Sequence, residues 1–142
     1  FEKNYSYYGT PFFETRCADD KIKIIYGHHI RGEKMFGELI NYNNTDYLLS
    51  HDTVHLYTQQ GDEQYRVLCA LYTDGEDSKK IYSRAINGLF TEDEYNAFVT
   101  DVLNSASAKN DSVTTAFGDE FLILSTCEYS KDDGRFVVIC VK

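Results

Sequence analysis

The chain has 142 residues, of which 42% are hydrophobic and 15% aromatic. This length and apolar content predict one folded domain over residues 1–142, with a sizeable core, and exclude a disordered chain. The formal net charge of −9 argues against nucleic acid or an anionic lipid surface as a partner, because both need a basic patch and none is visible. No run approaches the roughly 18 apolar residues that span a bilayer.

The first half of the chain predicts strands with one short helix. The aromatic stretch from Tyr5 to Phe13 is interrupted by glycine and proline, which predicts a broken edge strand. A strand from Lys21 to Tyr26 stops at Gly27-His28-His29, where glycine permits a close approach of the backbone. The apolar positions between Glu33 and Tyr42 mark one face of a helix. We expect a short strand at 47–49, a hairpin of strands at 53–58 and 64–72 with a turn at 59–63, and a solvated loop at 74–80.

The second half predicts one well-marked helix and two final strands. Thr91 and Glu94 form a capping-box pattern that opens a helix running to Ala106. The apolar run from Phe121 ends at Cys127, a charged turn over 130–134 follows, and the run 136–141 is suited to a strand buried on both faces. About seven to eight strands with two inserted helices predict a mainly β fold, a closed or nearly closed barrel.

The four cysteines are spread along the chain with no CxxC pair, so a zinc or thioredoxin-like site is not expected. Cys69 and Cys140 fall inside apolar runs and are predicted to be small core residues. Cys17 has no assignable role, and a disulfide is left open because nothing favours one. Cys127 alone stands at a strand end beside polar residues. We expect no metal and no cofactor.

Three residues at predicted strand ends could support cysteine catalysis. If the two final strands form a hairpin, Cys127 and Arg135 lie at the same rim, where a cation lowers the pKa of a thiol and stabilises a developing oxyanion. His28 could transfer the proton. Spacing alone also allows the ordinary interpretation, in which the histidine is a surface residue and the cysteine is inert.

Longer motifs carry a resemblance to a known family. The segments Tyr26-Gly27-His28-His29-Ile30, Met35-Phe36, Leu124-Ser125-Thr126-Cys127 and Gly134-Arg135-Phe136-Val137-Val138 resemble those of the class B sortases. The predicted helix from Thr91 to Ala106 occupies the place of the helix that this class carries before its cysteine strand. The resemblance runs from about Tyr5 to the end of the chain, with the motifs in the family's order.

The resemblance implies a cysteine transpeptidase. Cys127 would be the nucleophile that forms a thioester, and His28 would be the general acid and base, with His29 the less favoured choice. Arg135 would hold the signal peptide and stabilise the tetrahedral intermediate. Residues lining the groove beside the thiol would be Ser125 and Thr126. The substrate would be a C-terminal sorting signal of the Asn-Pro-x-Thr-Asn type on a secreted protein.

The resemblance also implies a partner and a location. The acceptor would be an amine on a cell-wall precursor or on a pilin, and the enzyme would act on the outer face of a Gram-positive membrane. The family begins with a membrane anchor and N-terminal helices, and this chain, which opens on Phe1-Glu2-Lys3, has neither; we expect them upstream in the full-length protein. The alternatives are a pilin-polymerising sortase, a cysteine peptidase that only hydrolyses, and a non-enzymatic β-barrel module that binds a peptide.

Overall fold

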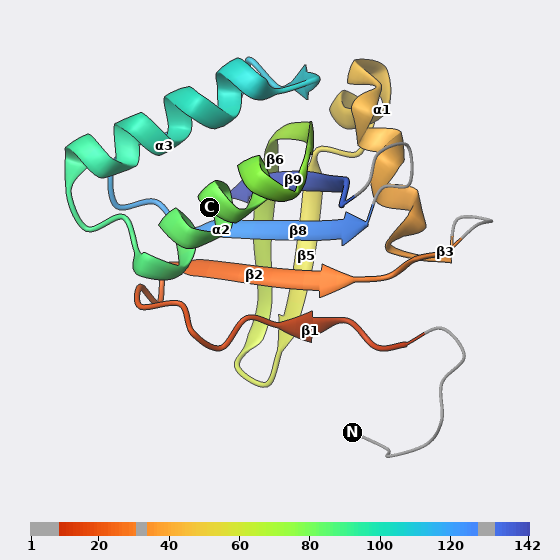
Figure 1. Ribbon diagram of the computed structural model, residues 1–142, viewed down its shortest axis with the longest axis horizontal. Coiled ribbons are helices and arrows are strands. Elements are labelled where there is room, and N and C mark those ends of the chain that lie inside the picture. Colours follow the sequence, from red (N-terminus) through yellow and green to blue (C-terminus); the bar gives the residue numbers. More distant parts are fainter. Residues whose placement is uncertain (1–8, 31–33, 128–132) are drawn as a thin grey trace.

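The fold centres on one seven-stranded sheet with helices on both faces (Figure 1). The computed structural model describes residues 9–30, 34–127 and 133–142. The strands of this sheet are β1 (Phe12–Phe13), β2 (Ile22–Gly27), β5 (Thr53–Thr58), β6 (Gly61–Thr73), β7 (Ala108–Lys109), β8 (Phe121–Cys127) and β9 (Arg135–Val141). A separate ribbon pairs β3 (His29–Ile30) with β4 (Lys34–Met35), and the helices are the 3-10 helix η1 (Phe36–Asn43), α1 (Thr45–Ser50), α2 (Gly75–Asn87) and α3 (Glu92–Ser105).

The strand order brings distant parts of the chain together. The order is β1-β2-β8-β9-β6-β5, and β7 also pairs with β6. The strands β2 and β8 run parallel, as their arrows show in Figure 1, and the other pairs of this sheet are antiparallel. The early strand β2 therefore lies beside the late hairpin β8–β9, and the ends of these three strands can form one site.

The predicted mainly β fold is confirmed, but the predicted closure of the barrel is wrong. Among the described residues, β1 and β5 stand at the two ends of the strand order and do not pair with each other. The strand β1 has only two residues, Phe12 and Phe13, and both are exposed. Closure is not needed to bury the sheet, since helices cover its two faces.

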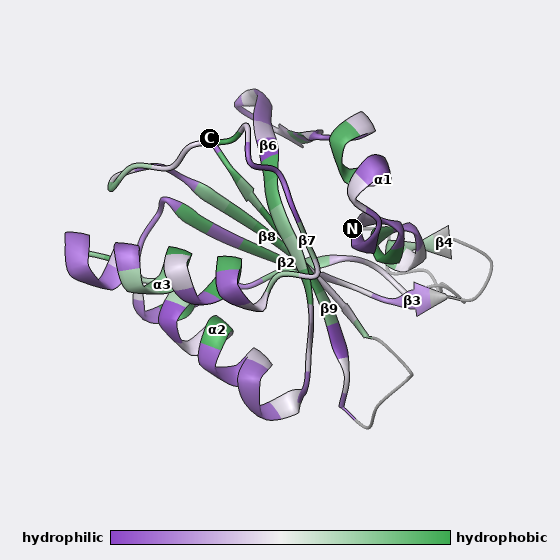
Figure 2. Cartoon of the chain, turned by 90° about the horizontal axis from the view of Figure 1, so that it is seen from above, coloured by the Kyte–Doolittle hydropathy of each residue, from purple (hydrophilic) through white to green (hydrophobic). Residues whose placement is uncertain are grey.

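Two hydrophobic layers lie on opposite sides of the sheet. One layer joins the sheet to α2 and α3, and the other joins it to η1 and α1. Alternate residues of β8 divide between the layers: Phe121 and Ile123 pack toward α2 and α3, while Leu122 and Leu124 pack on the other side. Figure 2 shows this arrangement, with hydrophobic colour concentrated in the central strands and hydrophilic colour on the outer helix faces.

Several predicted elements differ from those observed. Of the helix predicted between Glu33 and Tyr42, Glu33 lies outside the described residues, and the structure has β4 and then η1. The strand predicted at 47–49 is wrong, because the side chain of Asn44 accepts hydrogen bonds from the backbone of Asp46 and Tyr47 and starts α1 there. The hairpin β5–β6 is confirmed with a shorter turn, since Thr58 already pairs with Gly61.

The loop predicted at 74–80 is also wrong, because α2 begins there. The Asp74 side chain accepts hydrogen bonds from the backbone of Glu76 and Asp77, which caps the helix. Charged residues in its first turns masked the apolar spacing of Ile81 and Ala85 that follows. By contrast, α3 is confirmed with both hydrogen bonds of its capping box. Most of the turn predicted at 130–134, and Tyr5 of the first predicted strand, lie outside the described residues.

No helix in the described ranges is long and apolar enough to cross a membrane.

Candidate active site

The register of three strands brings the predicted catalytic residues to one end of the sheet. In the parallel pair β2–β8, Gly27 lies opposite Thr126. In the antiparallel pair β8–β9, Cys127 lies opposite Arg135. His28 directly follows Gly27, so the imidazole, the thiol and the guanidinium belong to neighbouring strand ends. Adjacent strands are about 4.8 Å apart, so residues in such a row can act on one reacting group.

The thiol and the guanidinium face the same side of the sheet. Along β8, Ser125 is on the side of α2, since its hydroxyl is hydrogen-bonded to the Tyr82 hydroxyl of that helix at 2.5 Å. Cys127 is two residues further, so it points the same way, as does its register partner Arg135. The pKa of the Tyr82 hydroxyl responds to both groups. Burial raises this pKa most, the Arg135 charge lowers it, and a charge on Cys127 raises it.

The two residues before the nucleophile are buried. Ser125 is 1% exposed and Thr126 is 2% exposed. Thr126 alternates with Ser125 and shares the side of Leu122 and Leu124, where η1 lies, and its hydroxyl has no hydrogen-bond partner among the described residues. The structure therefore separates the two residues, with Ser125 under α2 on the thiol side and Thr126 on the opposite side of the strand.

His28 lies at the surface, with the backbone of Gly9 against its ring. A Cβ atom added to Gly9 would lie 2.5 Å from His28 Cδ2, and Gly9 has a φ of +73°, so this position suits glycine on two counts. Within the described parts of the chain no side-chain hydrogen bond joins His28 to Cys127. Catalytic hydrogen bonds are often long without substrate and shorten when it binds.

Gly27 lets η1 close against the end of β2. A Cβ atom added to Gly27 would lie 2.5 Å from Phe36 Cγ, so the ring of Phe36 rests directly on the glycine backbone. The backbone N–H of Phe36 also donates to the His28 carbonyl at 3.1 Å. The close approach that the sequence predicted at this glycine is confirmed, and it anchors the residue that carries the imidazole.

Arg135 begins β9 in a half-buried position. Its Nη1 donates to the Gly134 carbonyl at 3.0 Å. No carboxylate among the described residues forms an ion pair with it. A guanidinium presents several N–H donors in a planar fork, and such donors suit a peptide carbonyl or an oxyanion near Cys127.

Sequence reasoning missed two contacts in this site. The His29 Nδ1 atom lies 3.0 Å from the carbonyl oxygen of Cys127. Tyr82 was unassigned because its helix was not predicted. The helical spacing of Ile81 and Ala85 around it could have revealed α2, but no sequence pattern predicts which strand residue its hydroxyl meets.

Two of the other thiols, those of Cys69 and Cys140, are more buried than that of Cys127. Cys69 and Cys140 are fully buried, as predicted, and burial raises the pKa of Cys69 to about 12 and that of Cys140 further still. All four cysteines are free. In the described ranges, no group of three or more His, Cys, Asp or Glu residues could hold a metal ion.

Comparison with known proteins relates this arrangement to the sortases. No family model matches the chain. Sortase B of Staphylococcus aureus is 28% identical over 144 aligned positions, covering 98% of this chain and 57% of that protein. Sortase B of Listeria monocytogenes is 30% identical over 122 positions, covering 84% of this chain and 47% of that protein. The chain thus spans about half the length of the curated relatives that it matches.

Solved structures show the same relationship in three dimensions. The Staphylococcus aureus sortase B–substrate complex has a TM-score of 0.84 and 26% identity, covering 99% of this chain and 64% of that one. The sortase B from the type II pilus of Streptococcus pneumoniae has a TM-score of 0.78 and 27% identity, covering 94% and 75%. A sortase B complexed with triglycine has a TM-score of 0.79 and 27% identity, covering 94% and 62%.

These similarities in sequence and fold relate the chain to the sortases. The relatives and structures named above are sortases of the B type, and together they support the predicted resemblance to the class B sortases.

Proposed function

We propose that the chain is the catalytic domain of a cysteine transpeptidase that cleaves a sorting signal and transfers the cleaved protein to an amine. The observation that supports this proposal is the strand register, which pairs Cys127 with Arg135 and ends the β2–β8 ladder at Gly27 and Thr126, the residues directly before His28 and Cys127. The family relationship supports the same chemistry, because one of the similar structures holds a substrate and another holds triglycine.

The proposed reaction has two acyl-transfer steps. The Cys127 thiolate attacks the carbonyl carbon of the scissile threonine peptide bond, and the carbonyl oxygen becomes an oxyanion that the Arg135 guanidinium stabilises. The intermediate collapses to a thioester as the leaving amine takes a proton from the His28 imidazolium. An acceptor amine then attacks the thioester carbon, gives its proton to the neutral His28 imidazole, and releases the thiolate.

The substrate that we propose is the Asn-Pro-x-Thr-Asn type of signal, and the location is the extracellular face of a Gram-positive membrane, with an anchor in the full-length protein. Of the two residues predicted to line the groove, Ser125 is on the thiol side of β8 and would contribute to it, whereas Thr126 is on the opposite side of the strand and would not line it directly. The acceptor would be a cell-wall precursor amine. A pilin lysine is the second candidate acceptor, favoured by the similarity to the sortase B of a pneumococcal pilus.

The test is mass spectrometry of the chain mixed with an Asn-Pro-x-Thr-Asn peptide. We expect an acyl adduct on Cys127 that disappears when triglycine is added and gives a transfer product. The Cys127→Ala variant should give no adduct and no cleavage while keeping the wild-type Tm. A Cys140→Ala variant, matched in chemistry but buried in the core, should keep the adduct.

Each alternative gives a different result. Acid product alone, with the amine present, would indicate a peptidase that only hydrolyses. Transfer to a lysine peptide in preference to triglycine would indicate a pilin-polymerising enzyme. Full activity of Cys127→Ala would overturn the assignment, and binding of the peptide with no cleavage by the wild-type chain would indicate a binding module.

A further inference from the structure

The parallel ladder of β2 and β8 ends one residue before the nucleophile. Its last pair is Gly27 with Thr126, and the next residue of β8 is Cys127. At this point the imidazole of His29 supplies a hydrogen bond to β8, with Nδ1 3.0 Å from the Cys127 carbonyl oxygen. A carbonyl oxygen only accepts, so Nδ1 carries the hydrogen and donates it.

The His29 backbone is itself held in place. In the β3–β4 ribbon, His29 pairs with Met35. The next residue, Phe36, donates its N–H to the His28 carbonyl at 3.1 Å and rests its ring on Gly27. The imidazole therefore extends from a braced segment and links the ribbon and η1 to the end of β8.

We propose that His29 is a positioning residue that orients the Cys127 peptide group, and through it the thiol, in the proposed transpeptidase. The proposal rests on the proposed function. The proposal gives two consecutive histidines different roles. His28, which follows the last residue of β2, transfers protons, and His29 holds the main chain of Cys127.

The position of Cys127 explains why such a contact matters. Cys127 is the last residue of β8, with β9 on one side, through Arg135, and the His29 imidazole on the other. Rotation of its peptide group would move the sulfur relative to His28 and Arg135, and a misplacement of about 1 Å at a reacting centre costs on the order of 100-fold in rate.

The test compares two substitutions of similar size. His29→Asn keeps an N–H donor on the atom attached to Cγ, while His29→Leu keeps the bulk and removes the donor. We expect His29→Leu to lower kcat about tenfold or more with KM within about twofold of the wild-type value, and His29→Asn to restore kcat to within about threefold. His55→Leu, at an exposed histidine on β5, should leave both constants unchanged.

A second readout follows the contact itself. In protein labelled with [1-¹³C]cysteine, the Cys127 carbonyl signal, assigned by its loss in Cys127→Ala, should shift in His29→Leu and keep the wild-type position in His29→Asn. An unshifted signal in His29→Leu, or a shifted signal with wild-type kcat, would overturn the positioning role. If the wild-type chain does not turn over the signal peptide, the proposed function is overturned instead. In that case the Cys127 carbonyl signal still shows whether His29 contacts the Cys127 carbonyl.

Discussion

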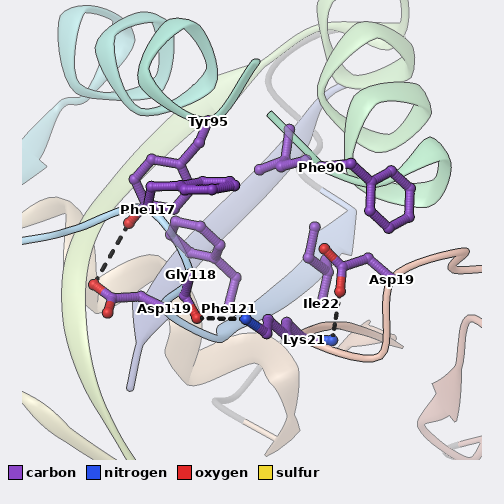
Figure 3. Close-up of a pocket in the computed structure, with 10 residues that line it drawn as sticks. Asp19, Lys21, Ile22, Phe90, Tyr95, Phe117, Gly118, Asp119 and Phe121 are labelled. Atoms are coloured by element: carbon purple, nitrogen blue, oxygen red, sulfur yellow. Dashed lines mark hydrogen bonds between the residues drawn. The ribbon is translucent and has the colours of Figure 1, made fainter. Parts of the chain in front are cut away.

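The two ends of the central strands differ in what their polar groups do. At the site end, Cys127 and Arg135 face each other across β8 and β9, and no carboxylate of the described residues pairs with the guanidinium. At the opposite end, where β2 and β8 begin, a cavity of about 340 Å³ has aromatic walls that include Phe90, Tyr95 and Phe117 (Figure 3).

The polar groups around that cavity form hydrogen bonds with nearby residues. Lys21 Nζ donates to the Gly118 carbonyl at 3.1 Å, and the Lys21 backbone N–H donates to Asp19. The Asp119 carboxylate accepts from the Ala116 backbone at 2.8 Å. Figure 3 shows the two contacts of Lys21, and it also shows the Tyr95 hydroxyl donating to the Asp119 carboxylate. Each cation donates to a backbone carbonyl, so the comparison teaches that the two ends differ in their neighbours: a thiol lies opposite the Arg135 guanidinium, and an aromatic cavity lies beside the Lys21 ammonium.

The largest effect on this comparison should come from removing the charge of Arg135, which lies opposite Cys127. We expect Arg135→Ala to lower kcat/KM for the signal peptide by about 100-fold to 1,000-fold, as for loss of an oxyanion donor. Arg135→Lys should recover only part of the lost kcat/KM, because the lysine ammonium lacks the planar fork of N–H donors that a guanidinium has.

The matched control lies at the other end of the strands. Lys21→Ala removes a cation from the cavity rim and should leave kcat/KM within about twofold of the wild-type value. Equal losses in the Arg135 and Lys21 variants would contradict the distinction between the two ends.

The next effect should come from the packing that anchors His28. Gly27→Ala places a methyl group against the Phe36 ring, and we expect it to lower the free energy of unfolding by about 1–3 kcal/mol, measured by chemical denaturation. Replacing Phe36 by Ala in the same chain should remove the clash, so the double variant should show coupling between the two sites. Additive losses would show that the ring is not what excludes a side chain at Gly27.

The smallest effect should come from the buried hydroxyl pair beside the thiol. Tyr82→Phe leaves the Ser125 hydroxyl without its partner, and we expect a loss of about 1 kcal/mol in the free energy of unfolding. Ser125→Ala should cost a similar amount, and the double variant should cost little more than either one. A thermal-unfolding series across the four proteins measures this. Full additivity would show that the two hydroxyls act independently.

Much of the site's framework follows from local sequence. The capping box at Thr91 and Glu94 and the apolar runs ending at Cys127 and starting after Arg135 were enough to predict α3 and the β8–β9 pair. Such features depend on neighbours along the chain, through caps, turns and side-chain periodicity. The order of the motifs also predicted that His28, Cys127 and Arg135 belong together, and the strand register agrees with that.

Only the tertiary structure determined which strands, helices and side chains contact one another. The open sheet, the contact of His29 with the Cys127 carbonyl and the pairing of Tyr82 with Ser125 join segments far apart in the chain. Each depends on which strand neighbours which and on which face of that strand a helix covers. Local periodicity predicts whether a residue is buried or exposed. It does not predict which distant residue that residue contacts, because the contact is set by the packing of the whole domain.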